Sequence, residues 1–117
     1  MRIRTIIILL GLLVSCKTEI QDFPKPKDVI PRDSMILVMK DLMVLENYIA
    51  NTYPETNVSP KLMTKSGDSL LSTYHISPKR FERSFQYYGT QKREMIKMYS
   101  EIQDSLTWEM NQLQVEK

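Results

Sequence analysis

Apolar residues recur at intervals of three and four along most of this chain, and no stretch alternates apolar and polar residues with a period of two. Intervals of three and four place side chains on one face of an α-helix, whereas a half-buried strand requires alternation. The sequence therefore predicts an all-α fold, a small bundle of three to four helices. The first apolar seam consists of Val38, Leu42, Leu45 and Ile49, and the last of Met95, Met98, Tyr99, Ile102, Leu106, Met110 and Leu113.

The first predicted helix, over residues 31–51, is apolar around most of its circumference. Met35 and Met39 widen the seam on one flank, and Tyr48 widens it on the other. The remaining narrow polar strip consists of Asp33, Lys40, Asn47 and Asn51. A helix of this kind either packs between other helices or presents an apolar face to a partner. Because a small bundle needs a central element, we favour packing between helices.

If the first helix instead presents an apolar face to a partner, three residues are candidates for the contact. Ile36 and Met43 project away from the seam of the first helix. Tyr87 adjoins Tyr88, which belongs to an aromatic face with Phe81 and Phe85, so Tyr87 is free to make a surface contact. Tyrosine is common at interfaces, and methionine adapts to varied apolar partners. We therefore interpret Ile36, Met43 and Tyr87 as partner-facing if this helical domain binds another protein.

Local signals predict the ends of the other helices. Residues 61–74 are compatible with a second helix despite Gly67. Because glycine costs about 1 kcal/mol in a helix interior, the alternative is a helix that begins only near Gly67 or Asp68. Ser77 followed by proline is typical of a helix N-terminus, and Gly89 can end this third helix. We expect Thr90 to cap the fourth helix.

The N-terminus has the composition of a signal peptide. Arg2 and Arg4 provide positive charge, and residues 6–14 lack a polar side chain. A membrane-spanning helix needs roughly 20 apolar residues, about twice as many as this run contains. We therefore predict a cleaved signal peptide over residues 1–15 rather than a transmembrane anchor.

The order Leu13, Val14, Ser15, Cys16 resembles the lipobox of bacterial lipoproteins. The resemblance implies that the Cys16 thiol receives diacylglycerol, that cleavage precedes Cys16, and that the new amine is acylated, commonly with palmitate. The alternative is a free thiol. One acyl chain anchors only marginally, whereas two or three hold a protein stably at a membrane.

These features predict the domain organisation and the location. Residues 1–15 form the lipoprotein signal peptide, residues 16–29 a flexible lipidated tether, and residues 30–117 the helical domain. The expected location is the bacterial cell envelope, lipid-anchored to the outer membrane on its periplasmic or surface side.

The charge balance excludes one class of partner. Removal of residues 1–15 takes away two arginines and leaves 14 basic residues against 14 acidic ones. The mature chain is neutral, and no Lys/Arg stripe along the sequence argues for nucleic acid. We predict no nucleic-acid partner.

The sequence offers little for catalysis. His75 is the only histidine and lies between two predicted helices, where we expect a turn that histidine tolerates. No Glu-x-x-His pair, Gly-x-Ser-x-Gly motif or glycine-rich phosphate loop is present. We predict no catalytic residue, no metal site and no cofactor. An enzyme that uses His75 would need it in a cleft beside an ionisable partner.

Two functions remain from this reasoning. The first is a non-catalytic interaction or structural module whose partner is another envelope protein. The second is a small carrier that holds an apolar ligand between helices, which requires an enclosed pocket of about 300 Å³ or more.

Several of these residues resemble a known group, the Bacteroidota lipoproteins of the domain of unknown function DUF4296. The resemblance covers roughly residues 28–106 and implies the location and the fold, with no activity, ligand or catalytic residue. Pro31 departs from the hydroxyl residue usual at that helix cap. The matching positions are Ile30, Met35, Asp41, Leu42, Ile76, Ser77, Phe81, Ser84, Tyr87 and Tyr88.

Overall fold

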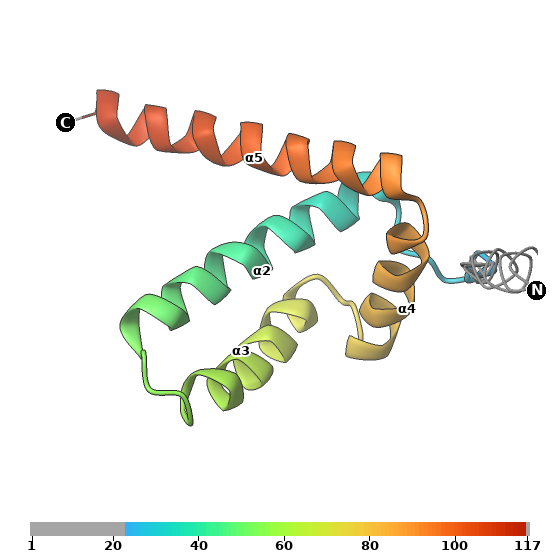
Figure 1. The fold of residues 1–117 in the computed structure, drawn as a ribbon, viewed down its shortest axis with the longest axis horizontal. Helices are drawn as coiled ribbons and strands as arrows, with labels where there is room; N and C mark the ends of the chain where they lie inside the picture. Colours follow the sequence, from blue (N-terminus) through green and yellow to red (C-terminus); the bar gives the residue numbers. More distant parts are fainter. Residues whose placement is uncertain (1–22, 117) are drawn as a thin grey trace, which may run out of the picture.

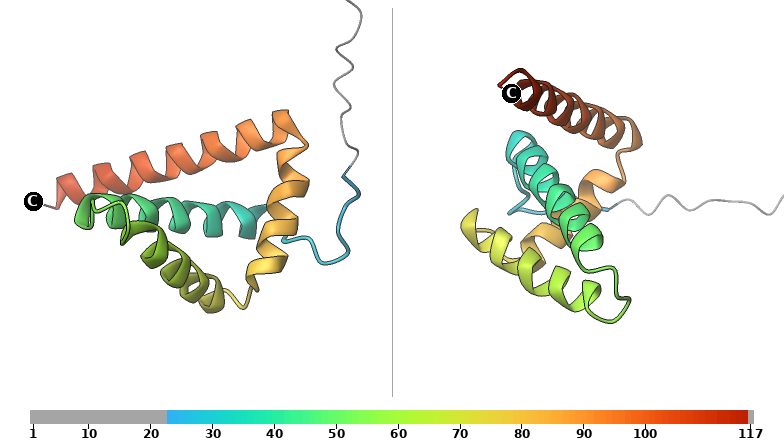
Figure 2. Two further views of the ribbon diagram at one scale, coloured as in Figure 1. Left: turned by 60° about the horizontal axis from the view of Figure 1, so that its bottom comes forward. Right: turned by 90° about the vertical axis from the view of Figure 1, so that its left-hand side faces the viewer.

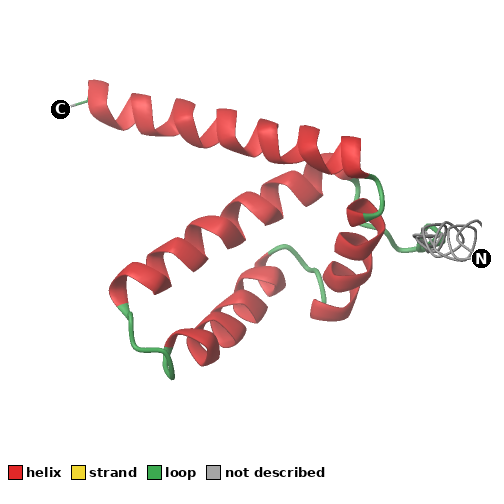
Figure 3. Ribbon diagram, viewed as in Figure 1, coloured by secondary structure: helices red, strands yellow, loops and turns green. Residues whose placement is uncertain are grey.

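A computed structural model describes residues 23–116, which form four α-helices joined by short loops. The helices are α2 (Arg32–Thr52), α3 (Ser59–Thr73), α4 (Pro78–Gly89) and α5 (Lys92–Val115). Within residues 23–116 there is no strand, and the predicted all-α bundle is confirmed (Figure 3). The predicted signal peptide, the lipobox and Cys16 lie outside the described residues.

Helix α2 is the central element of the fold (Figures 1 and 2). It forms an antiparallel pair with α3, and α5 lies along its other side. Arg32 of α2 contacts Glu101, and Lys40, two turns later, contacts Glu109, so α2 and α5 run in the same direction. Helix α4 crosses one end of this layer and connects α3 to α5. The predicted packing of the first helix between other helices is therefore correct.

The core lies where α4 meets the first halves of α2 and α5. Its centre is rich in methionine, which fills irregular space between helices. The buried apolar residues that cluster there are Ile30, Met35, Val38, Met39, Leu71, Ile76, Tyr88, Met98 and Ile102. Met35 and Met39 are buried as predicted, whereas Tyr48 is 61% exposed, contrary to its predicted place beside the seam.

Tyr48 is exposed because α5 packs on a different side of α2 from the one predicted. Lys40 belongs to the predicted polar strip, but its side chain is only 14% exposed. Its ammonium donates to Glu109 Oε1 at 2.5 Å and to Ser105 Oγ at 3.3 Å. A lysine can bury its aliphatic stem and still pair its charge, so α5 covers this side of α2 and Tyr48 stays in solvent.

The alternative start of the second helix near Gly67 is wrong, and so is the predicted Thr90 cap of the fourth helix. Helix α3 begins at Ser59, with a proline in its first turn, and continues through Gly67. Gly67 is buried, and a Cβ atom there would lie 3.7 Å from Leu42 Cδ2 of α2. Helix α5 begins at Lys92 rather than after a Thr90 cap, since the Thr90 hydroxyl instead donates to the Tyr87 carbonyl at 2.7 Å and closes α4.

The predicted start and end of α4, and the turn before it, are confirmed. The Ser77 hydroxyl accepts a hydrogen bond from the Arg80 amide, and α4 ends at Gly89. His75 has φ 55°, the left-handed conformation expected after a helix end. The Ile76 and His75 amides donate to the Leu71 and Ser72 carbonyls, each at 3.0 Å, which satisfies the free carbonyls at the end of α3.

Candidate binding groove

An apolar groove runs along one face of α2, between α3 and α5, and α4 closes one of its ends. We call it the methionine groove. Where all four helices meet, it contains a hollow of about 180 Å³, and a hollow of about 380 Å³ continues it between α2 and α5. The lining residues are Met39, Leu42, Met43, Glu46, Met63, Phe81, Phe85, Tyr99, Ile102, Gln103 and Leu106.

Aromatic residues form the walls of the methionine groove near α4. Phe81 and Phe85 stack with their ring centroids 5.9 Å apart. Phe81 packs against the core, whereas Phe85 is 39% exposed and Tyr99 of α5 is 41% exposed. These two partly exposed rings flank an open trough, so the groove offers apolar surface to a ligand without enclosing it.

Charge is sparse in the methionine groove. Glu46 is the one ionisable carboxylate among its lining residues, and it is exposed on the rim. The other polar groups there are the Gln103 amide and the Tyr99 hydroxyl. A ligand with an apolar face and a flanking positive charge would complement this arrangement.

The three predicted partner-facing residues occupy different environments. Met43 lines the methionine groove. Ile36 is partly buried and packs against the core. Tyr87 is also partly buried, with its ring edge toward Tyr88 at a centroid distance of 5.4 Å. The structure thus brings only Met43 to the groove.

Sequence reasoning missed Phe85 and Tyr99 as groove residues because their faces were assigned to the core. It also missed a second apolar stripe on α2, formed by Leu37, Val44 and Tyr48, which are 50%, 49% and 61% exposed. The spacing of seven and four between these residues places them on one helix face, so a signal was present in the sequence. Helices α3 and α5 leave this face of α2 uncovered.

Ion pairs between α2 and α5 hold one wall of the methionine groove in place. The Arg32 guanidinium donates two hydrogen bonds to Glu101, at 2.6 and 3.0 Å, and a third to Glu94. The hydrogen bonds from Arg32 lower the pKa of Glu101, and those from Lys40 lower the pKa of Glu109. The hydrogen bonds to Glu101 and Glu94 raise the pKa of Arg32.

A second set of contacts fastens the chain before α2 to α4. The buried amide of Ile30 donates to Ser84 Oγ at 2.9 Å, and the Tyr88 hydroxyl donates to the Ile30 carbonyl at 2.7 Å. Arg80 donates to the Asp28 carbonyl at 2.7 Å, and Arg83 pairs with the Asp28 carboxylate and lowers its pKa. We call Ile30, Ser84 and Tyr88 the Ile30 clamp, which sets where the chain enters the domain.

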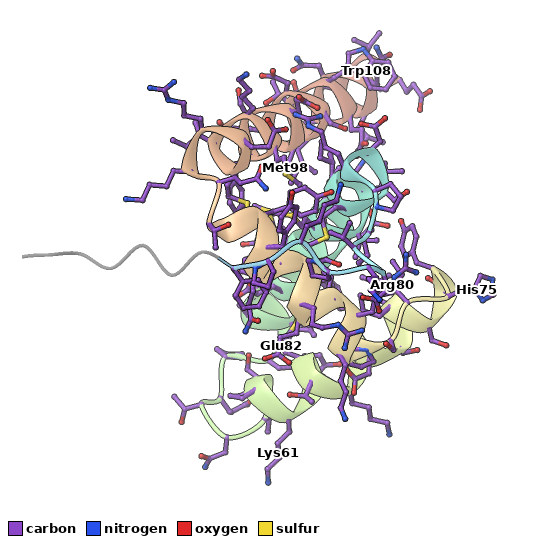
Figure 4. The ribbon with its side chains drawn as sticks, turned by 90° about the vertical axis from the view of Figure 1, so that its right-hand side faces the viewer. Lys61, His75, Arg80, Glu82, Met98 and Trp108 are labelled. Atoms are coloured by element: carbon purple, nitrogen blue, oxygen red, sulfur yellow. The ribbon has the colours of Figure 1, made fainter. Side chains whose placement is uncertain are left out.

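The described residues give little support to the hypothesis of catalysis by His75. The side chain is exposed in the turn after α3, at the edge of the molecule in Figure 4, whereas that hypothesis required a cleft. Across residues 23–116, no group of three or more His, Cys, Asp or Glu side chains is placed to hold a metal ion. Over the same range, no helix is long and apolar enough to cross a membrane.

A larger hollow, of about 500 Å³, lies at the turn between α4 and α5. Its lining consists of five consecutive residues, Thr90 to Glu94. This lining comes from one short segment, whereas the methionine groove gathers side chains from all four helices, so the methionine groove is the better candidate site despite its smaller hollows.

Comparison with known proteins identifies a family. The model of the family described as "Domain of unknown function (DUF4296)" matches residues 26–112, which include all of α2, α3 and α4 and most of α5. No curated protein and no solved structure matches the chain significantly.

Proposed function

Since the chain belongs to the DUF4296 family, whose description assigns no activity, we propose that it is a lipid-anchored lipoprotein of the bacterial cell envelope with a non-catalytic helical interaction domain. The lipid would be carried by Cys16 at the outer membrane. The methionine groove would bind a helix of another envelope protein. The observation that carries the binding role is the open apolar groove with Phe85 and Tyr99 partly exposed on its walls.

The shape of the groove supports a helical protein segment as the ligand. An amphipathic helix commonly binds by laying its apolar face in a hydrophobic groove, where Met-lined surfaces adapt well. Glu46 on the rim favours a partner helix with a lysine or arginine beside its apolar face. The carrier alternative requires an enclosed pocket of about 300 Å³ or more. The hollow lined by all four helices measures only about 180 Å³, and the hollow of about 380 Å³ is lined by α2 and α5 alone. Neither is an enclosed pocket of the required size, so the structure favours protein docking over a carrier.

The anchor is tested in cells of a bacterium that processes lipoproteins. We expect labelled palmitate to be incorporated into the full-length chain and to be lost completely in Cys16→Ser. Mass spectrometry of the N-terminal peptide should show cleavage before Cys16 and the mass of diacylglycerol with an added acyl chain. Recovery of an unmodified Cys16 from membranes would overturn the proposed anchor.

The groove is tested by co-purification from membranes of the full-length protein, with a matched aromatic control. The variant that carries Phe85→Ala and Tyr99→Ala removes both exposed walls, whereas Trp108→Ala removes a ring that is 63% exposed elsewhere on α5. Truncation of an interface hot spot weakens binding by about 30-fold or more. We expect the partner to be lost in the double variant and retained in Trp108→Ala. Equal retention in both would refute the groove as the binding site.

A further inference from the structure

The tertiary structure separates charge between the two ends of the described domain. Residues 23–33 and 77–97, which comprise the entering chain, the start of α2, α4 and the first turns of α5, carry nine basic and four acidic side chains. The remaining described residues, 34–76 and 98–116, carry three basic and eight acidic ones. A chain that is nearly neutral overall is therefore basic at the α4 end and acidic over the rest of the described domain.

Most of the basic side chains at the α4 end are available to a ligand. Arg32 and Arg83 are used in ion pairs, and Arg80 binds the Asp28 carbonyl. The other six are exposed and make no ion pair among residues 23–116. They are Lys25, Lys27, Lys79, Lys92, Arg93 and Lys97, and we call them the basic end.

The chain enters the domain at this same end. The segment Phe23–Ile30 lies beside α4, on the side of the molecule away from the C-terminus of α5 (Figures 1 and 2). Figure 4 looks onto this end, with Arg80 and Glu82 labelled beside α4 and the start of α5 above the point where the chain enters. The Ile30 clamp and the contacts of Arg80 and Arg83 with Asp28 keep the entering chain against α4.

We infer that the basic end binds an anionic phospholipid surface and thereby orients the domain on the membrane. This inference rests on the proposed anchor at Cys16. Lys25 lies nine positions after Cys16, a stretch that spans at most about 32 Å, so the anchor keeps the basic end near the headgroups. Each Lys or Arg near an anionic membrane surface strengthens binding by about fivefold, and this attraction acts within about 8 Å at physiological salt.

The orientation has a consequence for the proposed partner. Helix α5 has 24 residues, so it extends about 36 Å away from the α4 end. The excess of acidic residues at that far end disfavours contact with an anionic surface. With the basic end on the membrane, the C-terminal halves of α2 and α5 and the open end of the methionine groove between them point away from the bilayer, toward a partner.

The test uses the mature chain from residue 16 with Cys16→Ser, which retains every described residue and lacks the lipid. Circular dichroism first verifies that this chain is helical. Cosedimentation then compares vesicles of phosphatidylcholine alone with vesicles of phosphatidylcholine and phosphatidylglycerol in equal parts. We expect binding only to the anionic vesicles, and we expect it to weaken as salt concentration rises.

Two charge-matched variants locate the binding surface. Lys92→Glu with Arg93→Glu changes two exposed residues in the first turn of α5, where acidic residues favour the helix. Lys61→Glu with Lys65→Glu makes the same change of charge on α3. We expect the α5 variant to lose at least about 25-fold in vesicle affinity and the α3 variant to lose much less. Equal losses, or an unchanged α5 variant, would overturn the inference, as would binding to a DNA duplex without binding to anionic vesicles.

Because this assay uses a chain without lipid, it is independent of the proposed anchor. Palmitate labelling that depends on Cys16, together with an absence of vesicle binding, would refute the basic end alone. Vesicle binding by the basic end in a chain whose Cys16 is never lipidated would refute the anchor alone.

Discussion

The substitution Ser84→Ala tests whether the Ile30 clamp stabilises the domain. Ser84 is 0% exposed and Ile30 is 1% exposed, so water cannot replace the serine hydroxyl as acceptor for the Ile30 amide. A buried donor left without a partner destabilises a protein by about 1–3 kcal/mol. Alanine has the higher helix propensity, which offsets up to about 0.5 kcal/mol of that loss. We therefore expect Ser84→Ala to lower the free energy of unfolding by about 1–2 kcal/mol.

Urea unfolding of the mature Cys16→Ser chain, followed by circular dichroism, measures this loss. Each kcal/mol lowers the melting temperature of a domain of this size by about 4–8 °C. Ser100→Ala is the matched control, because Ser100 is an exposed serine within α5. We expect this control to be neutral or slightly stabilising.

A double-mutant cycle with Tyr88→Phe refines the result. Both side chains bond to the backbone of Ile30, so we expect their effects to be non-additive by about 0.5 kcal/mol or more. If Ser84→Ala is as stable as Ser100→Ala, the Ile30 amide does not depend on Ser84, and the clamp as described here is wrong.

Three further outcomes follow from the fold and its charges. Gly67→Ala should stabilise the domain by about 1 kcal/mol, because alanine favours the helix and its Cβ would meet Leu42 Cδ2 at an ordinary contact distance of 3.7 Å. Thermal unfolding measures this gain, and a lower melting temperature would mean that α2 and α3 pack too closely to admit the methyl group. His75→Gly should stabilise by about 0.5–1 kcal/mol, since glycine adopts φ 55° without strain, and a lower urea midpoint would contradict this reason. The pKa values of Glu101 and Glu109 are lowered in the folded state, so the stability they contribute is present above their unfolded pKa and is lost as pH falls through the folded pKa. Urea midpoints should therefore decrease between about pH 5 and pH 3, and a midpoint independent of pH over this range would show that these ion pairs do not stabilise the fold.

Local chemistry was sufficient to predict α4 and the turn before it. A serine cap, a proline in the first turn and a terminal glycine act within a few residues, and the structure shows α4 from Pro78 to Gly89 with Ser77 as its cap. His75 likewise adopts the expected turn conformation. The same local reasoning left open a start of α3 near Gly67, whereas the helix continues through this glycine, because packing against α2 outweighs its low helix propensity.

The rotation of α2 depended on residues far along the chain. Periodicity predicts Tyr48 on the flank of the apolar seam and Lys40 in the polar strip, whereas the structure exposes Tyr48 and pairs Lys40 with Glu109. Which face of a largely apolar helix is buried depends on where its neighbours lie. Here α5 supplies carboxylates that make the lysine side the more favourable one to cover.

By itself, the sequence determined that this domain is helical and where α4 begins and ends, because helical periodicity and capping act between residues close in the chain. It also carries the pattern that predicts lipidation at Cys16. Only the tertiary structure determined which residues form the methionine groove, the Ile30 clamp and the basic end. The clamp joins residues 54 and 58 positions apart, and the pair of Lys40 with Glu109 spans 69. Contacts over such separations form only when the helices pack, and the same packing gathers basic side chains that are scattered along the sequence onto one end of the domain.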